Sequence, residues 1–237
     1  MAAGRAMIGV VIPTLNEANT LPALLEDLRQ LGVRVPLDLV VVDGGSSDGT
    51  RTTAAAAGAH VVAAPRGRAR QLNAGAHAAH GEWLLFLHAD CRVTPACQAA
   101  LAAALGHDDA PEAAVFRFAV DLPPGWKQLL EWGQALRQAA FGLPYGDQGL
   151  LVRRRVFERV GGYPEIPIME DVAIIRHLAR LVEIKTLPAA LSTSGRRYRT
   201  GGVLRTALRH TMLLLLYGAG VSPERLAAWR DPHAQSL

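Results

Sequence analysis

Acidic side chains stand at three points where apolar runs of the sequence end or helical patterns begin. Asp43 follows the run 37–42, Asp90 closes the triplet His88-Ala89-Asp90, and Glu170-Asp171 opens a helical pattern. An ionised carboxylate can accept hydrogen bonds, bind a hard divalent cation through oxygen, or take a proton from a hydroxyl. These residues therefore offer binding, metal-ligating and base chemistry, and the capping of turns and helices is the alternative.

Arginines and amides form a second set of candidates. Arg66 and Arg68 precede a helical pattern that contains Gln71 and Asn73, and Arg196-Arg197 lies further along the chain. The planar guanidinium suits phosphate, and a loop that enters a helix can bind an anion. We predict that both arginine groups bind an anion, with solvent-exposed surface charge as the alternative.

These candidate residues lie between elements that alternate regularly. Runs rich in β-branched residues predict strands, and apolar residues at helical spacing, such as the leucines between 21 and 31, predict helices. The predicted strands are 7–12, 37–42, 60–63 and 82–87, and the predicted helices are 21–31, 50–57 and 70–80. The alternation predicts an α/β fold with a mostly parallel sheet and right-handed crossovers. Ligands bind beyond the carboxyl ends of such strands, where most of the candidates fall.

The second half of the sequence is less regular. We predict helices at 95–105, 126–141, 153–160 and 171–181, strands at 113–120, 150–152 and 183–187, and two further helices near 201–217 and 223–229. No internal repeat and no linker rich in Gly, Ser or Pro is present. We therefore predict one α/β domain over residues 1–195 and a helical C-terminal appendage over residues 196–237.

Composition narrows the class of protein. The chain has 237 residues, of which 50% are hydrophobic, so it can bury a core and is not disordered. The net charge is +4, and the basic residues do not cluster as nucleic-acid binding requires. Cys91 and Cys97 form no C-x-x-C pair, which predicts reduced cysteines in a cytoplasmic protein. We expect neither a signal peptide nor a transmembrane segment.

Four segments together resemble a known family. They are Val11-Ile12-Pro13-Thr14-Leu15-Asn16-Glu17, Val41-Val42-Asp43-Gly44-Gly45-Ser46-Ser47-Asp48-Gly49-Thr50, Phe86-Leu87-His88-Ala89-Asp90 and Glu170-Asp171. Over about residues 7–190 their order and spacing resemble family 2 glycosyltransferases of the GT-A fold. The His-Ala-Asp triplet and Gly146-Asp147-Gln148-Gly149 resemble, more narrowly, the small stand-alone members associated with radical-SAM and selenium-related domains. No glycine-rich loop follows the first strand, which argues against a nucleotidyltransferase or a dinucleotide-dependent dehydrogenase.

The resemblance implies a nucleotide-diphosphate sugar as donor, with UDP the expected nucleotide. It implies that Asp43 contacts the base, that Thr14 and Glu17 bracket the ribose and base, and that Asp90 binds Mn²⁺ or Mg²⁺. His88 replaces an acidic residue of the family pattern, which leaves one carboxylate fewer for the metal. The other donor-binding candidates are Pro13, Asn16, Arg66, Arg68, Gln71, Asn73 and Ala89, with Arg196 and Arg197 for the diphosphate.

On the acceptor side, the resemblance makes Asp171 the general base of an inverting transfer and Glu170 its orienting partner. Asp147 and Gln148 are expected in the acceptor or sugar pocket, while core packing is favoured over sugar stacking for Trp126, Trp132 and Tyr145. The acceptor is expected to be a small molecule or lipid-linked. A non-catalytic nucleotide-sugar-binding protein or membrane-associated scaffold is the alternative function, supported by His88.

The C-terminal helix expected near 201–217 has arginines in its first turns and leucines later. Packing on the domain or homodimerisation is the favoured interpretation. Peripheral contact with a membrane is the alternative, because an amphipathic basic helix can lie on a lipid surface.

Overall fold

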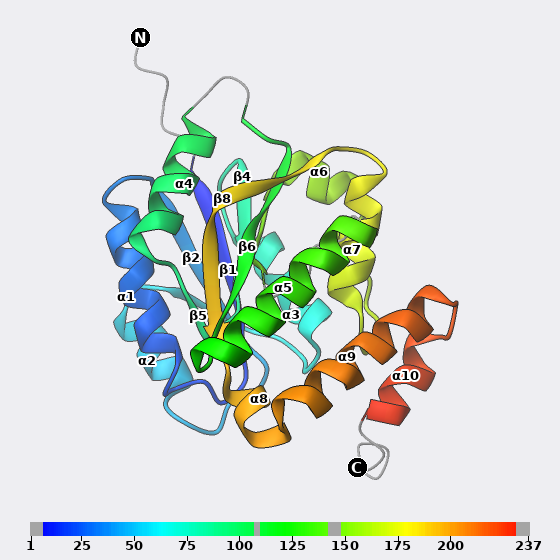
Figure 1. The fold of residues 1–237 in the computed structure, drawn as a ribbon. Coiled ribbons are helices and arrows are strands. Elements are labelled where there is room, and N and C mark those ends of the chain that lie inside the picture. The colour runs from blue at the N-terminus through cyan, green and yellow to red at the C-terminus, as the bar shows by residue number, and fades with distance from the viewer. Residues whose placement is uncertain (1–6, 107–109, 142–147, 231–237) are drawn as a thin grey trace.

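The computed structural model describes residues 7–106, 110–141 and 148–230, without the side chains of 134–141 and 197. Its centre is an eight-stranded sheet with the strand order β3-β2-β1-β4-β7-β6-β8-β5 (Figure 1). The strands are β1 Ile8–Thr14, β2 Leu37–Asp43, β3 His60–Ala63, β4 Trp83–Phe86, β5 Cys91–Arg92, β6 Ala113–Asp121, β7 Leu150–Arg153 and β8 Ile184–Ser194. The predicted α/β class is confirmed.

Helices connect these strands and continue beyond the last one. They are α1 Leu21–Gly32, α2 Thr50–Ala56, α3 Arg68–Ala78, α4 Pro95–Leu105, α5 Pro124–Phe141, α6 Arg154–Arg159, α7 Glu170–Ala179, α8 Arg196–Gly201, α9 Val203–Gly218 and α10 Pro223–Arg230. The predicted helix 95–105 has the bounds of α4, and most other predicted ends differ by one or two residues. The short helix α8 was not predicted.

The first four strands are all parallel. β1 pairs with β2 on one side and with β4 on the other, and β2 pairs with β3. The chain thus builds outward from β1 and then returns to β1's other side with β4. A crevice forms beyond the strand ends where the order reverses in this way, so the ligand site is expected between β1 and β4.

The second half of the sheet is mixed. β7 runs antiparallel to both β4 and β6, whereas β6 and β8 are parallel. β8 extends to Ser194, well past the predicted end at residue 187, and its ladder with β6 shifts register between Val115 and Arg117. Pro188, which has no N–H for a ladder, falls within that interruption. A proline therefore does not end this strand.

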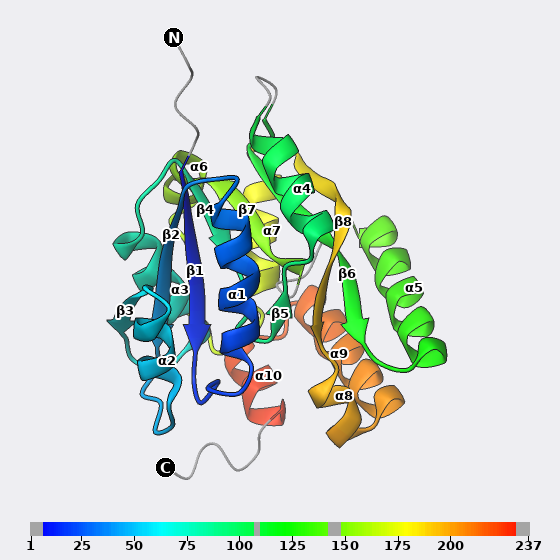
Figure 2. The ribbon, with the colours of Figure 1, turned by 90° about the vertical axis from the view of Figure 1, so that its left-hand side faces the viewer.

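Helices cover both faces of the sheet (Figure 2), and a buried hydrophobic cluster lies between the sheet and each layer of helices. α1 and α4 supply Leu24, Leu28 and Leu101 to one cluster, and α3, α6 and α7 supply Leu72, Phe157 and Ile174 to the other. A smaller cluster joins α7 to α9 and α10. Strands such as β1 are covered on both sides, which explains their continuous β-branched sequence.

The described part of the chain contains no helix that is long and apolar enough to cross a membrane.

Candidate functional site

A pocket lies beyond the carboxyl ends of β1 and β4, at the reversal point of the sheet. Its lining residues come from separate segments: Pro13, Arg68, Leu72, Phe86, Leu87, His88, Tyr163 and Asp171. Four predicted site residues, Pro13, Arg68, His88 and Asp171, therefore meet around one space. They lie near the end of β1, at the start of α3, just after β4 and at the start of α7, respectively.

Asp43 is buried beside this edge, with a relative exposure of 2%. One carboxylate oxygen, Oδ2, accepts hydrogen bonds from the backbone N–H groups of Gly45 (3.1 Å) and Ser46 (3.0 Å). The other, Oδ1, is buried without a hydrogen-bond partner among the described residues. A buried carboxylate oxygen left in this way loses its hydration, so an N–H or O–H group of a ligand would stabilise it.

Asn16 joins the loop after β1 to the loop after β2. Its backbone N–H donates to Ser46 Oγ (2.9 Å), and its Oδ1 accepts from the backbone N–H of Ser47 (2.9 Å). Asn16 has a φ of 56°, a left-handed conformation that asparagine tolerates better than most residues. The two loops are thus fixed to each other before any ligand binds.

Glu17 connects the same loop to α8, which follows the last strand. Its Oε1 lies 3.4 Å from Arg196 Nη2, and its Oε2 accepts a hydrogen bond of 2.6 Å from Thr20 Oγ1. The contact brings α8 to the edge of the site, although 179 residues separate the partners. Arg66 is exposed in the segment between β3 and α3. The side chain of Arg197 and the whole of Asp147 and Tyr145 lie outside the described residues.

Three predicted donor-binding residues make hydrogen bonds within the protein. Thr14 Oγ1 donates to the carbonyl of Val42 (3.3 Å), and Gln71 Nε2 donates to the carbonyls of Thr14 and Val42, both at 2.9 Å. Asn73 donates to the carbonyl of Tyr163 and accepts from its N–H, both at 2.8 Å. Their contact with the nucleotide-sugar donor stays a prediction. In the structure all three side chains hold backbone groups of the protein in position.

Arg68 points to the acid pair. It was predicted among donor-binding residues, yet its Nε pairs with Glu170 Oε1 and its Nη2 lies 3.5 Å from Asp171 Oδ2. The Glu170 side chain is almost fully buried, so the arginine compensates a charge that would otherwise be costly to bury. Met169, just before the pair, has a φ of 68°, which turns the chain sharply into α7.

Tyr163 is a pocket residue that the sequence analysis missed. Its ring packs edge-on against Phe86, with centroids 5.1 Å apart. Burial, reinforced by the negative charge of Asp171, raises the pKa of Tyr163 far above its usual value. Its phenol is therefore neutral and can donate but not accept a proton. Gly161 and Gly162 precede it with positive φ, and this glycine pair was the available signal.

His88 and Asp90 lie at the end of β4, both half-buried, with buried Ala89 between them. Within the described residues no group of three or more His, Cys, Asp and Glu side chains could hold a metal ion. His88 and Asp90 therefore supply too few ligand atoms to enclose a metal ion with protein groups alone. The pair fits Mg²⁺ or Mn²⁺ held by one carboxylate, because such ions keep waters and take phosphate oxygens as ligands.

The remaining predictions concern Gln148 and the tryptophans. Gln148 is fully buried, and its Nε2 donates to the carbonyl of Phe116 (2.9 Å), so it supports the strand layer behind the pocket. The favoured core packing of Trp126 and Trp132 is wrong, since both are exposed on α5. The helical spacing of the apolar residues does not by itself tell which face of α5 packs against the sheet and which faces solvent.

The fold and the site define an α/β protein with a ligand crevice at the carboxyl edge of its sheet. Residues 9–159 match the family described as Glycosyl transferase family 2, and the chain belongs to that family.

Relatives of known name agree with this assignment. A PGL/p-HBAD biosynthesis glycosyltransferase of Mycobacterium tuberculosis is 31% identical over 166 residues, which cover 66% of this chain and 63% of the relative. The chain thus spans less than two thirds of that relative's length. Glucosyl-3-phosphoglycerate synthase of Mycolicibacterium smegmatis is 43% identical over 60 residues, covering 25% of this chain and 20% of the relative.

Two solved structures share the fold at low identity. Glucosyl-3-phosphoglycerate synthase of Mycobacterium tuberculosis, in complex with Mn²⁺, UDP and glucosyl-3-phosphoglycerate, has a TM-score of 0.60 at 20% identity, with 92% of this chain and 81% of that chain covered. TarS of S. aureus, residues 1–349 with UDP-GlcNAc, has a TM-score of 0.61 at 15% identity, with 80% and 58% covered.

Proposed function

We propose that this chain is an inverting glycosyltransferase that moves a sugar from a UDP-sugar to an acceptor hydroxyl with the help of Mn²⁺ or Mg²⁺. The observation that carries the proposal is the pocket lined by Pro13, His88, Arg68 and Asp171. It sets strand ends suited to a nucleotide donor opposite a carboxylate suited to act as base. Family membership supports the same reaction class.

Several features on the donor side of the pocket support a nucleotide as ligand. The unpartnered Oδ1 of Asp43 can accept the ring N–H of uracil, while Oδ2 stays bound to its own turn. Thr14 and Glu17 would bracket the ribose and base. Arg196, held near the site by Glu17, would contact the diphosphate, as would Arg197 and Arg66. The solved relatives that bind UDP or UDP-GlcNAc lend support to this donor class.

Asp90, with His88 beside it, would hold the divalent cation. When bound, such an ion neutralises the negative charge that collects on the departing diphosphate. One carboxylate suffices if the diphosphate oxygens and waters complete the coordination shell.

Asp171 would take the proton of the acceptor hydroxyl. The acceptor oxygen forms a bond to the anomeric carbon as the bond from that carbon to the diphosphate breaks, and the electron pair leaves with UDP. Arg68 and buried Glu170 fix the start of α7, so that Asp171 keeps one orientation. Neutral Tyr163 can donate a hydrogen bond to acceptor or sugar oxygens in the same pocket.

Finer assignments belong to the same proposal. The His-Ala-Asp triplet supports membership of the small radical-SAM and selenodomain-associated group. The acceptor is a small molecule or a lipid-linked compound. The chain is divided into a GT-A domain over residues 1–195 and a helical extension over residues 196–237, and Arg196 of the extension reaches the site.

Calorimetric titration of UDP into the full chain, with Mn²⁺ and then with EDTA, tests the proposal. We expect binding that EDTA weakens and that Asp90→Ala reduces to the EDTA level, because both remove the cation. Glu158→Ala, an exposed acid on α6, is the matched control and should bind as the wild type does. A panel of UDP-sugars is then assayed for UDP release. Absence of UDP binding in both conditions overturns the UDP donor, and binding without turnover favours the non-catalytic alternative.

A further inference from the structure

Helix α9 carries an exposed apolar stripe. Leu204, Leu208, Met212 and Leu215 lie at positions i, i+4, i+8 and i+11, and all four are exposed, Leu208 at 69%. This spacing places them on one side of the helix. Leu213 and Leu214, on another side, pack into the cluster with α7 and α10. The buried face therefore accounts for the attachment of α9, and the outer stripe has no role in the fold of the described residues.

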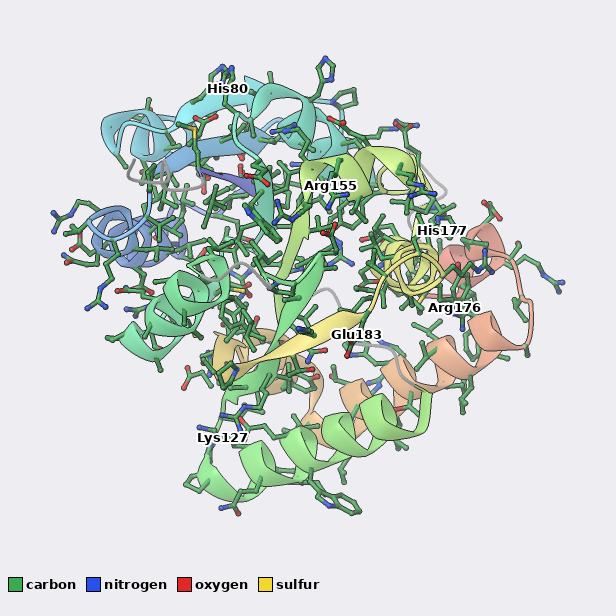
Figure 3. All side chains as sticks on the ribbon, turned by 90° about the horizontal axis from the view of Figure 1, so that it is seen from above. His80, Lys127, Arg155, Arg176, His177 and Glu183 are labelled. Atoms are coloured by element: carbon green, nitrogen blue, oxygen red, sulfur yellow. The ribbon has the colours of Figure 1, made fainter. Side chains whose placement is uncertain are left out.

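Helix α5 carries a similar exposed set. Trp126, Leu129 and Trp132 recur every three residues, and Trp132 is 66% exposed. Figures 1 and 2 show α5 and α9 running side by side along the β6–β8 half of the sheet. Figure 3 shows the same pair from above, with Lys127 at the start of α5. Two neighbouring helices thus each carry large exposed apolar side chains, and exposed apolar side chains that gather in this way are typical of an interaction surface.

The charges beside these stripes are all of one sign on α9. Arg205 and Arg209 each follow a stripe leucine and are exposed, and no ion pair joins them to another described residue. The sequence from 184 to 223 contains no Asp or Glu, but it contains Lys185 and five arginines between 196 and 209. An apolar stripe flanked by arginines complements a partner surface that has an apolar layer beneath a layer of anionic groups.

We propose that the exposed stripes of α5 and α9 dock on an anionic lipid bilayer. Leucine and methionine would enter the boundary between headgroups and acyl chains, and the two tryptophans would lie at the interface, where their amphipathic rings are favoured. The arginines would meet lipid phosphates. A second copy fits less well, since a two-fold contact through this face would bring the same arginines together.

Docking would also place the site beside the membrane. α8 leads directly into α9, and Arg196 of α8 contacts Glu17 at the edge of the pocket. An acceptor hydroxyl on a lipid headgroup would then be delivered near Asp171. This last step rests on the proposed glycosyl transfer, whereas docking itself does not.

Vesicle flotation of the full chain tests docking. Vesicles of phosphatidylcholine alone are compared with vesicles of phosphatidylcholine and phosphatidylglycerol in equal parts, at low and high salt. We expect binding to the anionic vesicles that salt weakens, and little binding to the neutral ones. Leu208→Gln should lower the partition coefficient about tenfold, because it removes one leucine from the apolar contact. Arg205→Gln with Arg209→Gln should lower it on anionic vesicles by about fivefold per arginine.

Val33→Gln is the matched control, since Val33 is an exposed apolar residue on the C-terminal side of α1. It should float as the wild type does, and all variants should keep the wild-type unfolding temperature and affinity for UDP. Absence of flotation, or flotation that Leu208→Gln leaves unchanged, overturns the proposal. So does a dimer in sedimentation velocity that Leu208→Gln dissociates, which would make a second copy the occupant. If UDP binding fails while flotation succeeds, the proposed function falls and docking stands.

Discussion

The two halves of the molecule build their sides of the site differently. The half from β1 to β4 brings its candidate residues together through consecutive βα units, so they lie at strand ends or in helix α3, elements that the sequence marks clearly. The half from β6 to α10 depends on antiparallel pairing of β7 and on contacts between distant segments, such as Arg68 with Glu170, 102 residues apart. Local pattern specifies the first half, and tertiary packing specifies the second.

Helix α3 is the element that joins the two halves. Gln71 bridges the carbonyls of β1 and β2, while Asn73 holds the backbone of Tyr163 and Arg68 holds the acid pair. One short helix therefore fixes the proposed donor side and the proposed acceptor side of the site relative to each other. Substitutions on the two sides should separate binding of the nucleotide from chemistry.

Asp171→Asn should have the largest effect and should act on the acceptor half alone. The amide cannot take a proton from the acceptor hydroxyl, so kcat should fall by about 10²–10⁴-fold, the usual contribution of a positioned base. The Kd for UDP should stay unchanged. Initial rates of UDP release and calorimetry measure the two quantities. Glu165→Gln, an exposed acid near the same helix, is the control and should keep its rate. Equal rates for Asp171→Asn and wild type would contradict the base assignment.

Asp43→Asn should produce the complementary result on the donor half. Its amide oxygen can still accept from the turn N–H groups, but Nδ2 would present a donor to the ring N–H of the base. A lost charge-assisted hydrogen bond predicts a rise of about tenfold to a hundredfold in the Kd for UDP. Asp48→Asn is the control in the same loop, because the bonds of Asp48 go to Ala18 and Thr50. A wild-type Kd for Asp43→Asn would exclude a contact between Asp43 and the base.

The same division explains what the sequence could predict. The alternating strands and helices up to residue 90 were placed nearly as the structure has them, because each is a single hydrophobic pattern with its own stop signal. β5 has two residues and carries no pattern, and β8 continues past Pro188 through an irregularity in its ladder with β6, in which β8 holds the extra residues. The existence of β5 and the length of β8 depend on pairing with a neighbouring strand. The local sequence pattern carries no information about that pairing.

Site residues show the same limit. Residue type identified Gln71 and Asn73 as polar groups near the strand ends, but their amides are used to hold backbone in place. Arg68 was expected beside the donor, and only the fold brings α7 within its reach. Tyr163 is in the pocket because α6 and the glycine pair return the chain there. The sequence predicts which side chains are chemically able to bind a ligand. The packing of the fold decides which partner each side chain contacts.

The smallest effects should come from glycines in one helix of each half. A Cβ at Gly75 of α3 would lie 2.3 Å from Val11 Cγ1 and 2.8 Å from Val42 Cγ2, whereas a Cβ at Gly133 of α5 would meet nothing within 4 Å. Gly75→Ala should therefore lower the free energy of unfolding by about 1–3 kcal/mol through overpacking. Gly133→Ala should raise it by roughly 0.5–1 kcal/mol through helix propensity.

Urea denaturation of both variants measures the difference between the two helices. The same propensity gain is available at Gly75, but it is smaller than the cost of moving two valines of the strands that α3 covers. A stabilised Gly75→Ala would mean that α3 can move away from β1 and β2, so it could not hold the two sides of the site in register. A destabilised Gly133→Ala would mean that the outer side of α5 is packed against another part of the chain, which would also remove α5 from the proposed membrane-docking surface.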